Sequence, residues 1–239
     1  DWWDGYRFNI PTDWWIAGKT AETTRDILQA TLFGTRATFG TGIIPGDLLG
    51  IPLYRTNSGG AIDTCEVEHV SGRKSLVGMK SFEQGRKSFE GTAKHGVWLD
   101  EEAPADVRDE CGMRLMSTGG LMIETFTPLQ GITPTIELYR GAGAKVAEEH
   151  GLTLREGRVS VNAGWDHVPH LTEEEKTRRA GETLPYLLEA RRSGIPSMGA
   201  GAIYPVVEAE IKVKDLAIPA HWKRAYTLDV GWNRTAALW

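Results

Sequence analysis

The chain has 239 residues, of which 41% are hydrophobic and 25% charged, and its formal net charge is -5 at pH 7. These values are typical of a folded globular protein and exclude a globally basic nucleic-acid binder, so any contact with DNA must come from a local patch. Cys65 and Cys111 form neither a disulfide framework nor a zinc-binding spacing, and no apolar run approaches the ~20 residues of a membrane span. Because the chain begins with Asp1 and ends within an apolar run, we expect it to be part of a longer protein.

The first regular element follows an irregular, aromatic segment. Apolar residues at Trp14–Ala17 predict a buried strand, and the next three residues, Gly18-Lys19-Thr20, copy the end of a phosphate-binding P-loop. That pattern requires glycine where the chain has Asp13, and a loop where the chain is bulky and apolar. We therefore reject a P-loop here and expect a helix from about Lys19 to Thr31, followed by a loop over 33–60.

The next segment predicts a β-hairpin. Residues 62–81 alternate in part around a turn at Ser71–Arg73, which favours a hairpin at the edge of a sheet. The following loop, 82–91, carries Arg86 and Lys87. It is either a solvated loop or a loop that senses phosphate or DNA, because an arginine guanidinium forms a planar fork for phosphate oxygens.

The central motif is a short apolar run, Val97-Trp98-Leu99, which ends in the carboxylates Asp100, Glu101 and Glu102. Such a run predicts a buried strand, and open α/β sheets bind ligands at the C-terminal ends of their strands. Asp followed by Glu at that point suits nucleotide hydrolysis, in which the first acid holds Mg²⁺ and the second orients and deprotonates the attacking water. The alternative is a strand that ends at the surface, where acidic residues are common.

After this motif the pattern predicts a helix over 106–116 and a strand over 121–127. Thr127 at the tip of that strand, beside the Asp-Glu tip, could sense the γ-phosphate of ATP or could close a turn. We then expect a helix over 135–149 and a short strand over 159–161.

The last third of the chain contains two helices, a boundary and a hairpin. A His-x-x-His spacing at His167 suggests a metal site, but the segment is not helical, so we prefer a packed loop. A capping box at Thr172–Glu175 starts a helix to about Ser193, divided by Pro185.

A segment rich in glycine, proline and serine, 194–201, predicts the end of one folding unit. Beyond it, residues 226–239 predict a β-hairpin with Asp229 inside its first strand. An aspartate at such a position would suit a metal site on the face of a sheet.

Taken together, these segments resemble the large subunit of tailed-phage DNA-packaging terminases. The matching segments, in the order of that family, are Trp15–Gly18, Glu22–Leu28, Gln84–Arg86, His95–Pro104, Thr125–Gly131, Arg192–Gly199 and Leu228–Asn233. The resemblance implies an α/β fold of the P-loop NTPase type, with a mainly parallel sheet and flanking helices, then a linker and the first hairpin of a ribonuclease H-like domain. It implies a partial ATPase domain over 1–193, a linker over 194–222 and the start of the nuclease over 223–239.

The resemblance also assigns roles to residues that would bind ATP and Mg²⁺. Asp100 looks like the Mg²⁺-coordinating Walker B acid, and Glu101 looks like the catalytic glutamate. Thr125 and Thr127 look like parts of the motif that couples ATP hydrolysis to DNA movement. Arg86 is the nearest candidate for an arginine finger that contacts the nucleotide.

For the nuclease, Asp229 looks like the first of the acids that bind Mg²⁺ or Mn²⁺. The P-loop lysine of the family would lie before Asp1 and the other nuclease acids beyond Trp239, so we expect the 239-residue chain by itself to be inactive. The implied partners are double-stranded DNA, the terminase small subunit, the portal protein of the procapsid and further copies in a homo-oligomeric ring. The implied location is the cytoplasm of the bacterial host, without a membrane partner.

Two other functions stay open. A DExx-type helicase or another P-loop ATPase also places a Ser/Thr motif on the strand after Asp-Glu, but a helicase needs a second ATPase-like domain, whereas Asp229 points to a nuclease. The third possibility is an inactive truncated copy that acts as a binding module. A glycine-rich loop ending in Gly-Lys-Ser/Thr upstream of this sequence would support the motor.

Overall fold

The computed structural model describes most of the chain. The described residues are 8–56, 58–140, 145–147, 152–155, 157–196, 219, 221–222, 227–230 and 235–238. The chain divides into two compact units, Asp1–Ile203 and Tyr204–Trp239. Within the described ranges, none of the helices combines the length and the apolar character that a membrane span requires.

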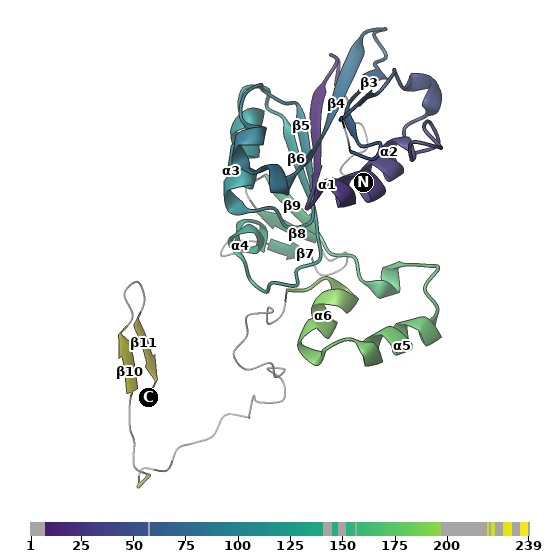
Figure 1. Cartoon of the computed structure of the whole chain (residues 1–239). Helices are drawn as coiled ribbons and strands as arrows, with labels where there is room; N and C mark the ends of the chain where they lie inside the picture. Colours follow the sequence, from purple (N-terminus) through teal and green to yellow (C-terminus); the bar gives the residue numbers. More distant parts are fainter. Residues whose placement is uncertain are drawn as a thin grey trace. The chain divides into compact units, whose positions relative to one another are not determined.

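A six-stranded sheet forms the centre of the first unit. Its strands are β1 (Asp13–Gly18), β2 (Leu53–Tyr54), β3 (Ile62–Glu68), β4 (Lys74–Ser81), β5 (Gly96–Asp100) and β6 (Leu121–Thr125). Their order is β2-β3-β4-β1-β5-β6, in which the four strands from β4 to β6 are parallel and β2 and β3 are antiparallel (Figure 1). This arrangement confirms a mainly parallel α/β sheet. The expected hairpin is β3–β4, but β2 covers one side and β1 the other, so it lies within the sheet.

Helices cover both faces of this sheet, on opposite sides of the central strands in Figure 1. On one face, inward residues of β1 and β5 pack with α3 (Ala105–Leu115) in a buried cluster of Trp15, Ala17, Phe82, Phe89, Val97, Leu99, Ala103, Val107, Cys111 and Leu115. On the other face, the sheet packs against the helix over 21–33. The buried residues of this second cluster are Ile16, Leu28, Leu32, Phe33, Ile62, Cys65, Val77 and Met79. Burial on both faces explains why the central strands are continuous apolar runs.

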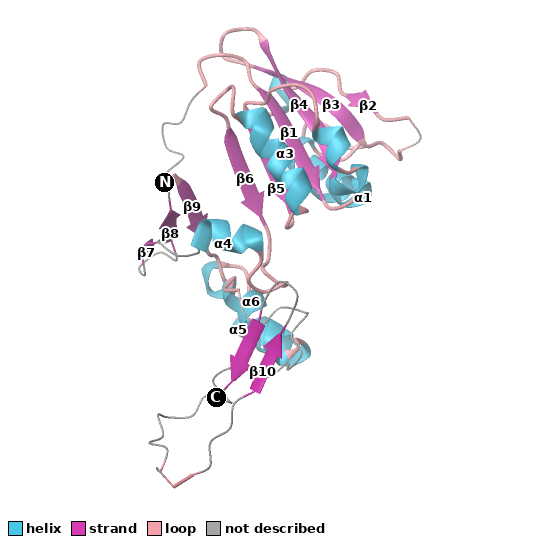
Figure 2. Cartoon of the chain, turned by 90° about the vertical axis from the view of Figure 1, so that its left-hand side faces the viewer, coloured by secondary structure: helices cyan, strands magenta, loops and turns pink. Residues whose placement is uncertain are grey.

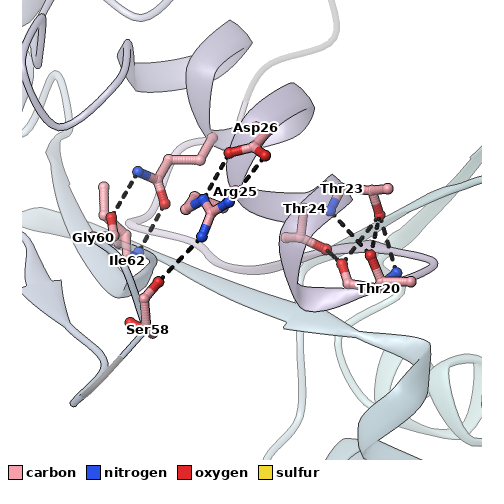
Figure 3. Close-up of polar contacts among 9 residues, drawn as sticks. Thr20, Thr23, Thr24, Arg25, Asp26, Ser58, Gly60 and Ile62 are labelled. Carbon is pink, nitrogen blue, oxygen red and sulfur yellow. Dashed lines mark hydrogen bonds and ion pairs between the residues drawn. The ribbon is translucent and has the colours of Figure 1, made fainter.

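The second helix is continuous in sequence and consists of α1 (Ala21–Thr23), the π-helical turn η1 (Thr24–Gln29) and α2 (Ala30–Phe33). It begins with a reciprocal cap, in which the Thr20 hydroxyl accepts from the Thr23 amide at 3.1 Å and the Thr23 hydroxyl accepts from the Thr20 amide at 3.0 Å (Figure 3). These bonds satisfy amides that would otherwise have no partner at a helix start. The Thr24 hydroxyl accepts from the Gly18 amide at 3.0 Å, which joins the helix to the end of β1.

A smaller sheet follows the main one. It consists of β7 (Lys145–Ala147), β8 (Leu152–Arg155) and β9 (Arg158–Val161), and α4 (Pro134–Arg140) packs against β8 and β9 (Figure 2). The expected helix over 135–149 is therefore wrong at 145–147, and its other residues after Arg140 lie outside the described residues. Val146 pairs with Thr153 in an antiparallel ladder, because β-branched side chains suit a sheet and the ladder satisfies the backbone.

The remaining described elements agree with the sequence pattern. Helix α5 (Glu173–Glu182) begins after Thr172, whose side chain accepts from the Glu175 amide at 3.2 Å, and α6 (Pro185–Ser193) starts at the proline that was expected to divide the segment. The strand expected over 121–127 is two residues shorter and ends at Thr125. Most of the expected linker, 197–218, lies outside the described residues.

The second unit contains the expected hairpin. Strands β10 (Thr227–Val230) and β11 (Thr235–Leu238) are antiparallel, and Asp229 lies opposite Ala236 in their register. The position of an aspartate inside a hairpin strand is thus confirmed.

Gln29 offers a test of how the loop before β3 is held. Its side chain is 2% exposed, its Nε2 donates to the Gly60 carbonyl at 3.1 Å and its Oε1 accepts from the Ile62 amide at 2.7 Å (Figure 3). Gln29→Leu retains the side-chain volume but leaves the buried Gly60 carbonyl and Ile62 amide without their hydrogen-bond partner. We therefore expect the free energy of unfolding to fall by about 2–4 kcal/mol. Urea unfolding followed by circular dichroism measures this loss.

Gln84→Leu is the matched control. The exposed Gln84 side chain accepts one hydrogen bond, from the Ser81 amide at 3.2 Å, so its loss should cost less than about 1 kcal/mol. Equal losses in the two variants would contradict the role given to Gln29.

Candidate functional site

The candidate site lies where three parallel strands end together. β1, β5 and β6 run side by side, Ala17 pairs with Leu99, and Asp100 lies directly opposite Thr125 (Figure 2). The residues that follow these positions therefore share one edge of the sheet, and Lys19 comes two residues after Ala17. The C-terminal edge of a parallel sheet is where open α/β folds bind their ligands.

Asp100 and Thr125 are in direct contact, whereas the sequence pattern placed Thr127 beside the Asp-Glu tip. The Thr125 hydroxyl donates to Asp100 Oδ1 at 2.6 Å. The indole Nε1 of Trp98 donates to the same hydroxyl at 2.8 Å. Trp98 and Asp100 lie on one face of β5 because side chains two residues apart in a strand point the same way.

Glu101 has the unusual backbone of this site. Its φ angle is 72°, which makes it the one non-glycine residue with a positive φ in the described part of the chain. Its amide donates to the Thr125 carbonyl at 2.7 Å, so the same threonine holds Asp100 by its side chain and Glu101 by its backbone. Backbone strain of this kind is concentrated at functional sites.

The electrostatic surroundings of Glu101 suit a proton acceptor. Partial burial of the carboxyl group, followed by repulsion from Asp100, raises the pKa of Glu101, and the positive charge of Lys19 acts in the opposite direction. A raised pKa brings a carboxylate nearer to the pH at which a general base works best.

The other two predicted nucleotide contacts lie differently. Thr127 follows β6, is exposed, and accepts a hydrogen bond from the Leu129 amide at 2.8 Å through its carbonyl oxygen. Arg86 Nε lies 3.0 Å from Oε2 of Glu110, a side chain that is 6% exposed and also contacts Arg114 at 2.9 Å. The structure thus ties Arg86 to α3, and a contact with phosphate would require it to leave Glu110.

The donor set at this edge fits one side of a Mg²⁺ site. The Asp100 carboxylate, held by the Thr125 hydroxyl, is a hard oxygen ligand, and Mg²⁺ usually keeps several waters and takes further oxygens from substrate phosphates. Among the described residues, no three or more His, Cys, Asp or Glu side chains gather as a metal-binding group. The fit therefore depends on one protein carboxylate together with water and phosphate oxygens.

Two neighbours of the site were not assigned to it from the sequence. Lys19 was expected to start a helix after a P-loop was rejected; the strand Asp13–Gly18 supports that rejection, and the helix starts two residues later, at Ala21. Trp98 was read as part of an apolar run. The two-residue spacing from Trp98 to Asp100 was a signal that both side chains share a face.

Comparisons with known proteins agree with this geometry. No protein-family model matches the chain. The chain is 30% identical over 247 residues to the terminase large subunit of Salmonella phage P22, in an alignment that covers 98% of this chain and 46% of that protein. The chain is a homologue of phage terminase large subunits. The terminase large subunit of Enterobacteria phage LP7 is 28% identical over 139 residues, which cover 58% of this chain and 27% of that protein.

The fold is similar to that of a terminase ATPase domain. The Thermus phage P74-26 large terminase ATPase domain superposes with a TM-score of 0.51 and 16% identity, over 77% of this chain and 76% of that domain. At this identity the likeness concerns the fold alone. The chain spans about half the length of the P22 relative, 46%, and 27% of the LP7 relative.

The strain at Glu101 can be measured by substitution with glycine. A left-handed backbone at a non-glycine residue costs about 1–3 kcal/mol, whereas glycine costs about 0.5–1 kcal/mol through the freedom of the unfolded chain. We therefore expect Glu101→Gly to leave the free energy of unfolding unchanged or to raise it by up to about 2 kcal/mol. Glu102→Gly, at a residue without a positive φ, should lower it. Equal destabilisation of both variants in urea would show that Glu101 is not strained.

Proposed function

We propose that this chain is part of a terminase large subunit that uses ATP hydrolysis to drive double-stranded DNA into a procapsid and cuts that DNA with a metal-dependent nuclease. The observation that carries the ATPase half is the β5–β6 register, which brings Asp100, Glu101 and Thr125 to one strand edge. The homology to terminase large subunits supports the packaging role over that of a helicase.

The residues of this edge have complementary roles in the proposed hydrolysis. Asp100, held by Thr125, would bind Mg²⁺, and Glu101 would orient the attacking water and accept its proton. Lys19 favours the ionised form of Glu101, which is the form that acts as a base. Bound Mg²⁺ supplies charge neutralisation at the phosphates of ATP. We propose further that Thr127 contacts the γ-phosphate, and that Arg86 reaches phosphate when it leaves Glu110.

A P-loop from outside this sequence would complete the site. In the described part of the chain β6 is the last strand of its sheet, and a hollow of about 730 Å³ borders it. Residues of β6, α4 and β9 line that hollow, and Arg108, Glu124 and Tyr139 form a buried polar network at its wall. We propose that the strand leading into the P-loop pairs with β6, because its loop would then lie beside Asp100 and Thr125.

For the nuclease half, the proposed division is an ATPase part over 1–193, a linker over 194–222 and a nuclease start over 223–239. The boundary between the two compact units, after Ile203, lies within that linker, which supports the division. Asp229 would bind Mg²⁺ or Mn²⁺ together with acids from other residues. The proposed partners are the terminase small subunit, the portal protein and further copies in a ring, all in the cytoplasm of the bacterial host.

Glu101→Gln tests the ATPase in the full-length protein. The amide retains the shape of the side chain but cannot accept the proton of water, so we expect the rate of ATP hydrolysis to fall roughly 10²–10⁴-fold while nucleotide binding is retained. Asp100→Asn should instead weaken Mg²⁺-dependent nucleotide binding. Glu102→Gln is the matched control and should hydrolyse ATP normally. Normal turnover by Glu101→Gln would refute the assignment, and absence of turnover in the wild-type protein would favour the binding module.

Asp229→Ala separates the two activities. Asp229 belongs to a different compact unit from Asp100 and Glu101, so the variant should lose DNA cleavage and retain ATP hydrolysis. Both activities are measured side by side on linear and supercoiled DNA. Loss of ATP hydrolysis with intact cleavage would show that the two-domain assignment is wrong, and two unchanged activities would make Asp229 a structural residue of the hairpin.

A further inference from the structure

Three side chains at the candidate site form one continuous chain of hydrogen bonds. Trp98 Nε1 lies 2.8 Å from the Thr125 hydroxyl oxygen, and that oxygen lies 2.6 Å from Asp100 Oδ1. An indole nitrogen can only donate, an ionised carboxylate can only accept, and a hydroxyl carries one hydrogen. The direction of both bonds is therefore determined: the indole donates to the hydroxyl, and the hydroxyl donates to the carboxylate.

We propose that Trp98 is a positioning residue that fixes the Asp100 carboxylate through Thr125. The indole occupies an acceptor position on the Thr125 oxygen, so the hydrogen of the hydroxyl is directed away from Trp98 and toward Asp100. The separation of 2.6 Å is that of a strong, charge-assisted O–H···O bond. Asp100 is thereby held through Oδ1, and its other oxygen, Oδ2, would be the one to hold a cation or its bound water.

Packing restricts the donor end of this chain of bonds, whereas the Thr125 side chain is exposed. Trp98 is partly buried and packs against the apolar cluster under α2, which limits rotation of its ring. Thr125 lies directly opposite Asp100, and its carbonyl accepts from the Glu101 amide at 2.7 Å. With the indole on one acceptor position of the Thr125 oxygen, the hydrogen can occupy either of the two others, and the close Asp100 carboxylate favours the one that points toward it. The chain of bonds stands on this geometry, whereas the role of Asp100 toward Mg²⁺ rests on the proposed function.

Trp14 provides a matched control within the same cluster. It lies on β1, is partly buried against the same apolar residues, and its indole donates to the Thr12 hydroxyl at 3.1 Å. Trp14 and Trp98 are thus the same residue type, pack on the same cluster and make the same kind of hydrogen bond. The threonine partner of Trp14, however, directly precedes β1, at the opposite end of the sheet from Asp100. Trp14→Phe and Trp98→Phe make equal changes in size and remove one indole donor each.

The test measures the side-chain rotamer of Asp100 by NMR in the 239-residue chain. Three-bond couplings from the carboxyl carbon of Asp100 to its backbone nitrogen and carbonyl report the χ1 angle. We expect a single rotamer in the wild type, in Trp14→Phe and in Thr125→Ser, which retains the hydroxyl. We expect averaged couplings in Trp98→Phe and Thr125→Val. The indole resonance of Trp98 should move in Thr125→Val, while that of Trp14 should not.

Two results would overturn the proposal. A single Asp100 rotamer in a folded Trp98→Phe variant would show that the indole does not position the carboxylate. Averaged couplings in the wild type would show that the hydrogen bonds do not hold it. In a full-length protein that hydrolyses ATP, Trp98→Phe should raise the Mg²⁺ concentration for half-maximal activity about tenfold, as for other groups that orient a metal ligand. Absence of ATP hydrolysis in the wild type would refute the proposed function, and the rotamer measurement would still decide this inference.

Discussion

The parallel pairing of β5 with β6 is the constraint on which the candidate site depends. In the observed register Asp100 lies opposite Thr125, and both the side chain of Asp100 and the backbone of Glu101 bond to that threonine. Because side chains alternate between the two faces of a strand, a slip of one residue would turn the Thr125 hydroxyl to the other face. A single register thus ties two consecutive acids to one threonine of the neighbouring strand.

Packing on both sides of the sheet holds that register. Val97 and Leu99 have no exposed surface and point toward α3, while Trp98 points toward the cluster under α2. A slip would exchange these two sets of side chains and expose apolar surface on one face. The buried strand therefore supports the strained backbone of Glu101 directly after it, where the chain leaves the sheet toward α3.

Local patterns in the sequence predicted several elements because the physics there is local. The β3–β4 hairpin, the Thr172 cap and the start of α6 at Pro185 depend on residues a few positions apart. The expected helix over 135–149 is wrong at 145–147, where pairing with β8 satisfies the backbone. Such pairing depends on a partner strand, which residue propensities do not specify.

By itself, the sequence determined which chemistry this chain can offer: a buried apolar run that ends in Asp100 and Glu101, and a threonine-containing strand after it. Those features depend on residue type and short spacing. Only the tertiary structure decided that Lys19 acts on Glu101, that Arg86 binds Glu110 and that Trp98 reaches Asp100 through Thr125. These interactions join residues that are far apart in the chain. Lys19, Asp100 and Thr125 come together because parallel strands from separate segments end at one edge of the same sheet, whereas Arg86 meets Glu110 because the segment Arg86–Phe89 packs on α3.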